Sequence, residues 1–496
     1  MICASMKRIL FLAVFLIATV VQAAKPNIVF ILADDMGYGD FGRFNNGYVE
    51  TPALDQLIDD GTCFSQHYAG SAVCSPSRAA LLTGRYPIRT GAITPQEVLG
   101  MDRIALGETT IADHFKSAGY ATGMVGKWHN GALDPRFHPN ARGFDEFAGF
   151  RGGWADYYKW RLDRNGKFEM SDGRYLTDVL TQEAIGFIQR HQSEPFFLMV
   201  PYNAPHSPLQ APEAVTEKYV ARGLSRGVAL TYAMIEVMDQ GVAAIRQELE
   251  TTGLSNNTIF MFTSDNGPAF MLRDDQVPEG VSIDTTRWNC GFNGAKGSVY
   301  EGGIRVPMIM HWPAGMPGGG RELTDTMHFI DWLPTLASMC DVPIRAGKPL
   351  DGVDVTQILQ GDAQPSYPDR FWQWNSYRPI GTSNAAMRSA NWKLVRPVNS
   401  GIHFASAEDE ELADRYVEKD IEYKYQPENI TEIFRWPEPN RVIPDPLLVE
   451  LYDLSSDPNE QNNLAADQPQ RATKMLNELQ SWFEEVETER QAIPAV

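Results

Sequence analysis

The segment that decides the fold is Ile28-Val29-Phe30-Ile31-Leu32-Ala33-Asp34-Asp35. An apolar run without polar alternation is typical of a strand that is buried on both faces, as in a parallel sheet. The run ends in two adjacent carboxylates, Asp34 and Asp35. Because open α/β sheets bind ligands at the carboxyl ends of their strands, these two residues are the first candidates for a functional site.

The same design recurs at three later apolar runs, residues 121–125, 196–200 and 258–262, which follow helical patterns. Strands that alternate with helices predict an α/β fold, in which a large, mostly parallel sheet lies between two layers of helices. Parallel strands would bring their trailing loops to one edge of the sheet. The loop residues that would meet there are Lys127, His129, His206, Asp265 and Asn266.

Four of these candidates carry only oxygen donors: Asp34, Asp35, Asp265 and Asn266. Oxygen ligands suit a hard cation such as calcium or magnesium better than zinc. Single aspartates after strands are often helix caps, so the prediction depends on the four residues lying together.

A cysteine precedes the most distinctive helix, in the stretch Cys74-Ser75-Pro76-Ser77-Arg78-Ala79-Ala80-Leu81-Leu82-Thr83-Gly84-Arg85. Pro76 suits the first helical turn, and we expect Ser75 and Ser77 to cap its free amides. Cys74 would then lie at the positive end of the helix dipole, with Arg78 one turn along, an arrangement that favours an anionic group. The alternative is an inert, buried cysteine, which is the usual fate of a free thiol.

The Cys-x-Pro-Ser-Arg core with its Leu-Thr-Gly-Arg continuation resembles the signature of the type I, formylglycine-dependent sulfatases. This family belongs to the alkaline-phosphatase-like superfamily. The resemblance extends from about Lys25 to Leu464, and within the family the chain resembles bacterial secreted arylsulfatases and carbohydrate sulfatases. Its further motifs are Asn27 to Asp35, Gly126-Lys127-Trp128-His129, Ser264-Asp265-Asn266-Gly267, the segment 294–307 with Lys296, and the tail 451–464.

The resemblance implies that a maturase oxidises Cys74 to Cα-formylglycine (3-oxoalanine). The hydrated aldehyde would attack the sulfur of a sulfate ester and form a covalent sulfo-enzyme intermediate. The implied cofactor is Ca²⁺ rather than Mg²⁺. The implied metal ligands are Asp34, Asp35, the modified Cys74, Asp265 and Asn266.

The resemblance also assigns catalytic roles. His129 would handle the proton of the hydrate, and Arg78 would orient it. Lys127 and Lys296 would hold the sulfuryl oxygens. His206, alone or with Lys296, would protonate the leaving alcohol. Each lysine taken singly would be an ordinary surface residue, and His206 taken singly would order its loop.

The N-terminus predicts a secretory signal peptide over residues 1–23. Lys7 and Arg8 precede the apolar run 9–21, and small residues favour cleavage after Ala23. The run is short for a membrane span, so an uncleaved anchor is the alternative. We therefore expect an exported protein, periplasmic or secreted, whose mature chain has no membrane span.

The mature chain is expected to hold a catalytic domain over residues 24–365 and a smaller C-terminal α+β subdomain over residues 366–496. Residues 370–394 hold short strand-like runs, and residues 387–394 resemble a strand of the small domain of the sulfatase family. Residues 469–487 predict a terminal helix, so we expect a small antiparallel sheet with a helix packed on it. The acidic stretch 408–422 predicts a solvated insertion or helix face.

Charge and cysteine content narrow the function further. The formal net charge is −20, with a pI near 4.9, which argues against a nucleic-acid partner. A site for a sulfate ester must therefore concentrate positive charge locally. If Cys74 is modified, Cys63, Cys290 and Cys340 allow at most one disulfide.

Two segments rich in aromatic and arginine side chains are candidates for substrate contacts. They are residues 151–167 and 370–378, and the candidate residues are Trp154, Tyr157, Arg161, Trp372 and Arg378. Such residues can stack on sugars and bind anions, although ordinary loop packing explains them equally well. The resemblance favours a sulfated polysaccharide or its oligosaccharides as substrate. The alternatives are a phosphodiester or phosphonate ester hydrolase of the same superfamily, and an inactive protein that binds sulfated glycans.

Overall fold

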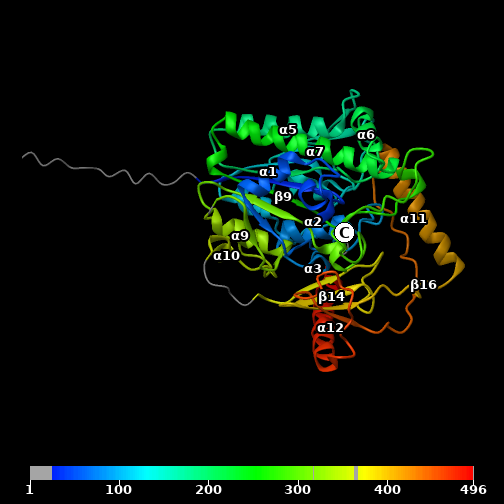
Figure 1. The fold of residues 1–496 in the computed structure, drawn as a ribbon. Helices are drawn as coiled ribbons and strands as arrows, with labels where there is room; N and C mark the ends of the chain where they lie inside the picture. The colour runs from blue at the N-terminus through cyan, green and yellow to red at the C-terminus, as the bar shows by residue number, and fades with distance from the viewer. Residues whose placement is uncertain (1–24, 317, 362–366, 495–496) are drawn as a thin grey trace, which may run out of the picture.

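A computed structural model describes residues 25–316, 318–361 and 367–494 of the chain. The predicted signal peptide, residues 1–23, lies outside these residues. A mixed ten-stranded sheet forms the centre of the molecule (Figure 1). Its order is β11 (Arg321–Leu323), β2 (Thr62–Phe64), β10 (Met308–His311), β9 (Thr258–Ser264), β1 (Asn27–Ala33), β8 (Phe196–Pro201), β4 (Ala121–Lys127), β5 (Glu146–Phe150), β6 (Arg161–Arg164) and β7 (Lys167–Met170).

The four strands predicted from apolar runs are neighbours at the centre of this sheet and run parallel. Strand β1 pairs with β8 on one side and β9 on the other, so that Ile28 lies opposite both Phe197 and Ile259. Strand β4 pairs with β8. The predicted α/β fold with a mostly parallel central sheet is therefore confirmed, with antiparallel strands β10, β6 and β7 toward its edges.

Strand β1 is apolar throughout because each of its faces meets a separate core. Ile28, Phe30 and Leu32 pack into one core, and Val29 and Ile31 pack into the other. The second core is covered by α1 (Pro52–Asp60), α5 (Leu176–Arg190), α6 (Glu213–Val220) and α7 (Arg226–Thr251). The first core is covered by α2 (Cys74–Thr83), α3 (Pro87–Thr90), α4 (Ile111–Ser117), α9 (Trp332–Met339) and α10 (Thr356–Gln360). Figure 1 shows α5 and α7 on one side of the sheet and α9 and α10 on the other.

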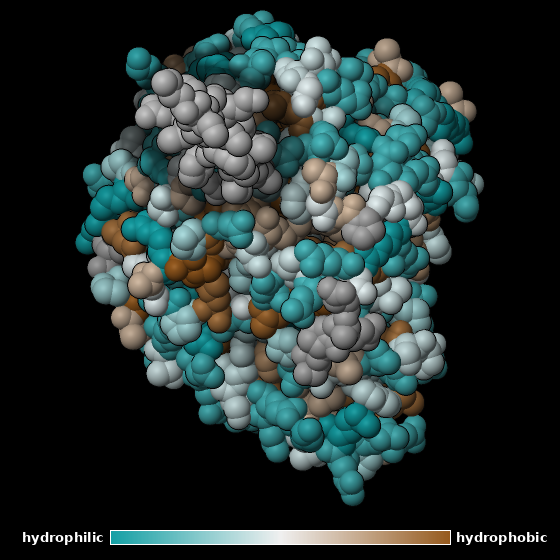
Figure 2. Space-filling view, turned by 90° about the vertical axis from the view of Figure 1, so that its left-hand side faces the viewer, coloured by the Kyte–Doolittle hydropathy of each residue, from teal (hydrophilic) through white to brown (hydrophobic). Residues whose placement is uncertain are grey.

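Helix α7 is the one described helix that is long and apolar enough to cross a membrane. Within its most apolar window, 78% of the helix is buried inside the protein, as expected of a core helix. The face of the molecule in Figure 2 is largely hydrophilic, with small separate apolar spots.

The C-terminal part forms the predicted antiparallel sheet with a helix packed on it (Figure 1). The strand order is β13 (Arg370–Gln373), β14 (Ala385–Ser389), β15 (Trp392–Arg396) and β18 (Glu450–Asp453), and the helix is α12 (Pro469–Gln491). The acidic stretch is helix α11 (Ala407–Tyr425), which lies along the side of the larger part. Smaller elements are β3 (His67–Tyr68), α8 (Glu301–Ile304), β12 (Met327–His328), β16 (His403–Phe404) and β17 (Arg441–Val442).

Candidate active site

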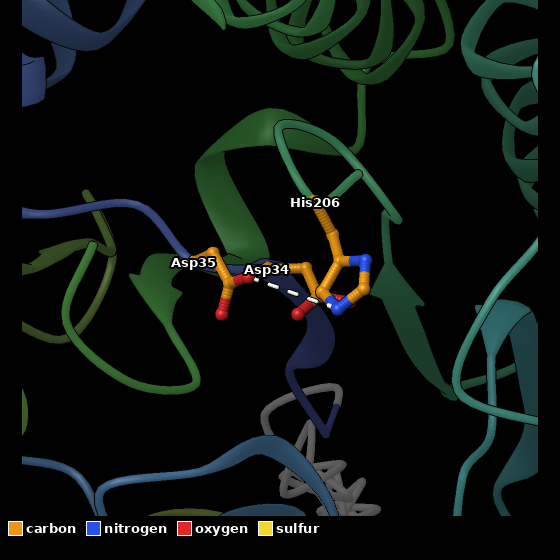
Figure 3. A group of neighbouring side chains, drawn as sticks. All are labelled: Asp34, Asp35 and His206. Atoms are coloured by element: carbon orange, nitrogen blue, oxygen red, sulfur yellow. Dashed lines mark ion pairs between the residues drawn. The ribbon is translucent and has the colours of Figure 1, made fainter. Parts of the chain in front are cut away.

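The polar residues that follow the parallel strands lie together. Asp34 and Asp35 follow β1, and His206 lies in the loop after β8. Their side chains point toward one another in Figure 3, and one ligand atom of each lies within 4.8 Å of those of the other two. Both aspartates are buried and His206 is nearly so. The carboxyl end of the sheet therefore forms an enclosed polar site.

Asp34 is neutralised by two cations that come from different elements. Lys127 Nζ, at the end of β4, lies 2.5 Å from Asp34 Oδ2, and Arg78 Nη2 of α2 lies 3.4 Å from the same oxygen. Burial alone would raise the pKa of Asp34, but these positive charges hold it below its ordinary value. Asp34 is therefore a carboxylate at neutral pH.

Asp35 is neutralised in a similar way by Lys296, the lysine of the motif segment 294–307. Lys296 Nζ lies 2.8 Å from Asp35 Oδ2, Asn266 Nδ2 donates to Oδ1 at 2.7 Å, and His206 Nε2 lies 3.7 Å from Oδ2. Burial opposes ionisation, but Lys296 keeps the pKa of Asp35 below its ordinary value. Asp35 has φ of 67°, a conformation that non-glycine residues adopt rarely and that concentrates at functional sites.

Arg78 links the third carboxylate to the site. Its Nε and Nη2 atoms both lie 2.8 Å from Asp265 Oδ2, and its Nη1 donates to the backbone oxygen of Lys127. Burial and the neighbouring charge of Asp34 raise the pKa of Asp265 to about 8. A divalent cation bound beside it would favour the carboxylate form.

Cys74 is the first residue of α2 and is buried, with only 2% of its surface exposed. Arg78, Lys296 and Asp265 all lie close enough to its sulfur to interact with it electrostatically. The N-terminus of α2 and the surrounding cations favour an anionic group at this position.

The prediction that Ser75 and Ser77 cap the first turn of α2 is wrong. The helix begins at Cys74 after Val73, and no side chain caps it. Ser75 Oγ instead donates to the backbone oxygen of Asp102, and Ser77 Oγ accepts a hydrogen bond from the Gly70 amide. Both hydroxyls are used because the whole helix is buried against neighbouring loops, which leaves its first turn without a side-chain cap.

His129 is held in a defined tautomer. Its Nε2 lies 3.1 Å from the Pro95 carbonyl oxygen, which can only accept, so Nε2 carries the proton. Its Nδ1 is buried and has no hydrogen-bond partner among the described residues. Burial, reinforced by the charge of Lys127, lowers the pKa of His129 to about 3. The ring is therefore neutral, and its Nδ1 has a free lone pair.

His206 is oriented by its own loop. Its Nδ1 lies 2.7 Å from the Ser207 carbonyl oxygen, so Nε2 is the unprotonated nitrogen that faces Asp35. Burial and the charge of Lys296 lower the pKa of His206 to about 3. The Tyr157 hydroxyl lies 2.8 Å and 2.9 Å from the carbonyl oxygens of Asn203 and His206, which fixes the loop.

Two buried oxygens in the site have no hydrogen-bond donor among the described residues. They are Asp34 Oδ1 and Asn266 Oδ1. Buried acceptors are rarely left without a partner, and a hard cation would satisfy both. The residues present therefore fit the oxygen-liganded metal that the sequence predicts.

The five predicted substrate residues divide by location. Trp154 and Arg161 line a cleft of about 410 Å³. Trp372 lies in the core between the two parts, where its indole donates to the Ala69 carbonyl oxygen. Its burial, with 1% exposed, leaves no face for substrate.

Tyr157 is likewise fully buried, and it positions the His206 loop rather than facing the cleft. Arg378 is exposed and is paired with Glu438 at 2.7 Å. Neither residue lines the cleft of Trp154 and Arg161. The two sequence segments thus supply two residues at the cleft and two structural aromatic residues.

Other residues at the site were missed by sequence reasoning. Glu97 Oε1 lies 3.4 Å from His129 Nε2, and Tyr423 and Lys424 at the end of α11 line the cleft with it. Glu97 stands in a segment without strand or helix pattern, and the other two follow an acidic stretch that reads as solvated surface. No local signal marks them, because only the tertiary fold brings them to the site.

The described cysteines are not joined in disulfides. Cys63, Cys74, Cys290 and Cys340 are all free thiols in the described part of the chain. Burial raises the pKa of Cys63 and Cys340 to about 12, so both are unreactive.

Comparison with known proteins agrees with this geometry. Mouse (Mus musculus) arylsulfatase J is 31% identical over 410 residues, which cover 75% of this chain and 64% of the mouse protein. Dog (Canis lupus familiaris) N-acetylgalactosamine-6-sulfatase is 36% identical over 385 residues, which cover 72% of this chain and 70% of the dog protein. The chain thus spans about two thirds of the length of these relatives.

A solved structure is also similar over nearly the whole chain. The crystal structure of Ps i-CgsB in complex with k-i-k-neocarrahexaose superposes with a TM-score of 0.74 at 27% identity, and the match covers 92% of each chain. The family model described as Sulfatase matches residues 26–342, which hold every motif residue of the site. The chain therefore belongs to the sulfatase family, a family of sulfuric ester hydrolases.

Proposed function

We propose that this chain hydrolyses sulfate esters of a sulfated polysaccharide or its oligosaccharides, with Cys74 converted to formylglycine by a maturase. The observation that carries the proposal is the placement of Cys74 at the start of α2, among Arg78, Lys296 and Asp265. The names of the dog relative and of the Ps i-CgsB complex favour a carbohydrate substrate.

The proposed reaction has two steps at residue 74. One hydroxyl oxygen of the hydrated aldehyde attacks sulfur, the S–O bond to the alcohol breaks, and the sulfuryl group is left on residue 74. The second hydroxyl then loses its proton, the C–O bond to sulfate breaks, and the aldehyde and free sulfate are released. Water re-forms the hydrate. An unmodified cysteine has no second hydroxyl for this step.

The geometry supports a division of roles among the side chains. His129 is neutral with a free Nδ1 and accepts the hydrate's proton, while Arg78 and Lys127 supply positive charge near residue 74. Lys296 holds a proton, because Asp35 raises its pKa above its ordinary value although burial opposes this. Lys296 would supply the proton of the leaving alcohol, and the unprotonated Nε2 of His206, which also lies beside Asp35, would pass it on.

We propose Ca²⁺ as the cofactor, with Mg²⁺ as the second choice. Asp34, Asp35, Asp265, Asn266 and the modified residue 74 would hold it. The cation would stabilise negative charge on oxygen during the reaction. Removal of metal with a chelator is expected to abolish turnover, and added Ca²⁺ is expected to restore it.

The first test is the mass of the peptide that contains residue 74, from protein made beside a formylglycine-generating maturase. The mass of formylglycine in place of cysteine is expected, together with turnover of 4-nitrophenyl sulfate that the Cys74→Ala variant lacks. Unmodified cysteine, beside a control sulfatase that is modified in the same cells, would remove the nucleophile. Glycan binding without turnover would then favour the inactive binding protein.

The second candidate is a phosphodiester or phosphonate ester hydrolase, since the same site accepts a tetrahedral anion. Matched 4-nitrophenyl sulfate, phenyl phosphonate and phosphodiester substrates separate the two. A higher kcat/KM for the sulfate ester supports the sulfatase, and a higher value for either phosphorus ester reverses the assignment.

We also propose that residues 1–23 are removed during export to the periplasm or the medium. N-terminal sequencing of the protein recovered outside the cytoplasm is expected to begin at Ala24. An intact Met1 or Met6 on membrane-bound protein would support the uncleaved anchor instead.

A further inference from the structure

The cleft that holds Trp154 and Arg161 has two walls from distant parts of the chain. One wall comes from residues 150–170, between β5 and the end of β7, and the other from residues 423–431 at and after the end of α11. The Trp154 and Tyr425 rings join the walls, with their centres 4.6 Å apart. The cleft encloses about 410 Å³, which is room for one or two sugar rings.

Two glycines, one of which lines the cleft, lie between the cleft and His129. A side-chain carbon added to Gly153 would lie 2.3 Å from the His129 ring, so this backbone is in direct contact with the ring. A carbon added to Gly152 would lie 2.9 Å from Tyr423 and 3.3 Å from Glu97 Oε1. The two glycines thus form a short bridge from His129 to the cleft wall. The cleft wall is therefore next to the residues that surround His129.

Three cations that line the cleft, Lys159, Arg161 and Lys424, have side chains that make no hydrogen bond or ion pair with any residue that the structure describes. Lys159 is exposed, whereas Arg161 and Lys424 are partly buried. Arg161 instead stacks on the Phe168 ring, with its guanidinium carbon 3.7 Å from the ring centre. Burial lowers the pKa of Lys424, although Glu97 and Asp420 oppose this shift. Buried cations normally have an anionic partner.

Three of the four carboxylates that line the cleft, Glu97, Asp156 and Asp163, are engaged elsewhere, and the fourth, Glu428, is exposed and forms no ion pair with a described residue. Asp163 binds His138 at 3.1 Å and Arg151 at 3.3 Å, and Glu97 accepts a hydrogen bond from the Gly153 amide. Burial and the charge of Glu97 raise the pKa of Asp420, behind Lys424, to about 8, which leaves it largely protonated at neutral pH. No described carboxylate therefore neutralises both partly buried cations.

We propose that this cleft is a subsite for a second anionic sugar residue of the substrate, with Lys424 and Arg161 binding its sulfate or carboxylate group. The proposal rests on the proposed glycan sulfatase function and restricts the class of substrate. The exposed faces of Phe168 and Tyr425, each 47% exposed, are suited to stack on the sugar ring. The substrate is then at least a disaccharide with an anion on both sugars, not an isolated sulfated monosaccharide.

The test compares a small substrate with a long one. The variants Lys424→Met and Arg161→Gln, and a control Lys167→Met on the exposed strand β7, are assayed with 4-nitrophenyl sulfate and with tetrasaccharides of chondroitin sulfate and carrageenan. We expect KM for the tetrasaccharide to rise about tenfold in each cleft variant, with kcat nearly unchanged. Kinetics with 4-nitrophenyl sulfate, and all kinetics of the control, should match the unaltered chain.

Equilibrium binding keeps the result independent of turnover. Catalytically inactive Cys74→Ala protein is titrated with the same tetrasaccharides, with and without Lys424→Met. We expect about tenfold weaker binding in the double variant and a smaller salt dependence, because one ion pair is lost. Equal binding by both proteins, or equal KM values in all variants, overturns the subsite. Failure of the proposed sulfatase function can be distinguished from failure of the subsite, because in that case the unaltered chain would not turn over 4-nitrophenyl sulfate.

Discussion

His129 and His206 each direct one ring nitrogen to a backbone carbonyl oxygen, and this fixes which nitrogen is free. For His129 the free atom is Nδ1, and for His206 it is Nε2. Burial lowers both pKa values to about 3, so neither ring carries a charge at neutral pH. The site thus separates two proton acceptors from Lys296, which holds a proton beside Asp35. This separation suits a reaction that removes one proton and supplies another.

Tyr157 is a positioning residue for His206, and its removal tests that role. Tyr157→Phe removes the hydroxyl that contacts the Asn203 and His206 carbonyl oxygens, of which the Asn203 oxygen keeps the His206 amide as a donor, a loss of about 1–3 kcal/mol. We expect kcat to fall roughly ten- to hundredfold, because the His206 loop is no longer fixed, with little change in KM. The matched control is Tyr158→Phe, whose hydroxyl makes no hydrogen bond with the described residues. Equal kcat values for the two variants would contradict the positioning role.

Asn266 is expected to be required for metal binding rather than only for folding. Its Oδ1 lacks a donor, as does Oδ1 of Asn130, which lies near Ser75 and outside the proposed ligand set. Ca²⁺ at about a hundred times its Kd should stabilise the unaltered chain by about 2.7 kcal/mol. Asn266→Ala should lose this increase in Tm, whereas Asn130→Ala should keep it at a lower starting Tm. Loss of the increase in both variants would assign the effect to general damage.

Sequence motifs predict most of this site, because its residues stand directly after strands or at a helix start. Asp34 and Lys127 can be placed in this way without knowledge of the loops between them. Glu97 and Lys424 cannot, because their positions depend on how long connections fold across the site. Trp372 is the opposite case, a residue that the sequence predicts as a substrate contact but that is buried in the core. An aromatic residue in a polar segment can serve either purpose.

At the scale of elements, the predictable strands are those buried on both faces. Strands β1, β4, β8 and β9 are apolar runs of seven or fewer residues, and burial of both faces makes them easy to identify. Strand β7 (Lys167–Met170) is exposed along its whole length, and β2 (Thr62–Phe64) has three residues. Neither has a periodic pattern, so their pairing is decided by neighbouring strands rather than by their own sequence.

Helix α12 is fastened to the larger part by ion pairs that should respond to acid. Glu489 binds Arg85 at 2.6 Å and Arg89 at 2.7 Å, and although burial opposes the shift, these bonds lower its pKa from 4.5 to about 2. A lowered pKa gives stability that is complete above pH 4.5 and is lost as the pH falls toward 2. Because the side chain is partly exposed, we expect the contribution to stay below about 1 kcal/mol.

The measurement is the free energy of unfolding in urea between pH 7 and pH 3. Glu489→Gln should lower it at pH 7 and should flatten its fall below pH 4.5. Glu484→Gln, on the same helix and without an arginine partner among the described residues, should leave both features unchanged. Parallel pH profiles for Glu489→Gln and the unaltered chain would show that the ion pairs contribute nothing.

At the scale of the whole molecule, the net charge of −20 and the positive site have opposite effects on a sulfated glycan. The acidic surface repels a polyanion at long range, and salt screens this repulsion over about 10 Å. The cations at the site act at contact distance in a buried environment, where screening is weaker. The strongly acidic chain can therefore still bind an anionic ester, because its compensating charges are concentrated where the strands end.

The predicted division at residue 365 falls within residues 362–366, which lie outside the described residues, and the described segments on its two sides share a hydrophobic core. One hydrophobic cluster includes Leu82 and Tyr86 from the larger part, Met387 from the small sheet, and Leu479 and Trp482 from α12. The Tyr86 and Trp482 rings meet edge to face with their centres 5.1 Å apart. Separating the two parts would expose this cluster to water, at a cost of about 25 cal/mol for each Å² of apolar surface.

We therefore expect the protein to unfold as one unit. Scanning calorimetry of the full chain should give a single transition, with the calorimetric enthalpy equal to the van't Hoff enthalpy. A Trp482→Ala variant, which removes an aromatic side chain from the shared cluster, should lower the Tm of that one transition by several degrees, since such truncations cost about 3–5 kcal/mol. Two transitions, of which only the smaller responds to Trp482→Ala, would instead show that the C-terminal part unfolds independently. The predicted boundary near residue 365 would then separate two autonomous domains.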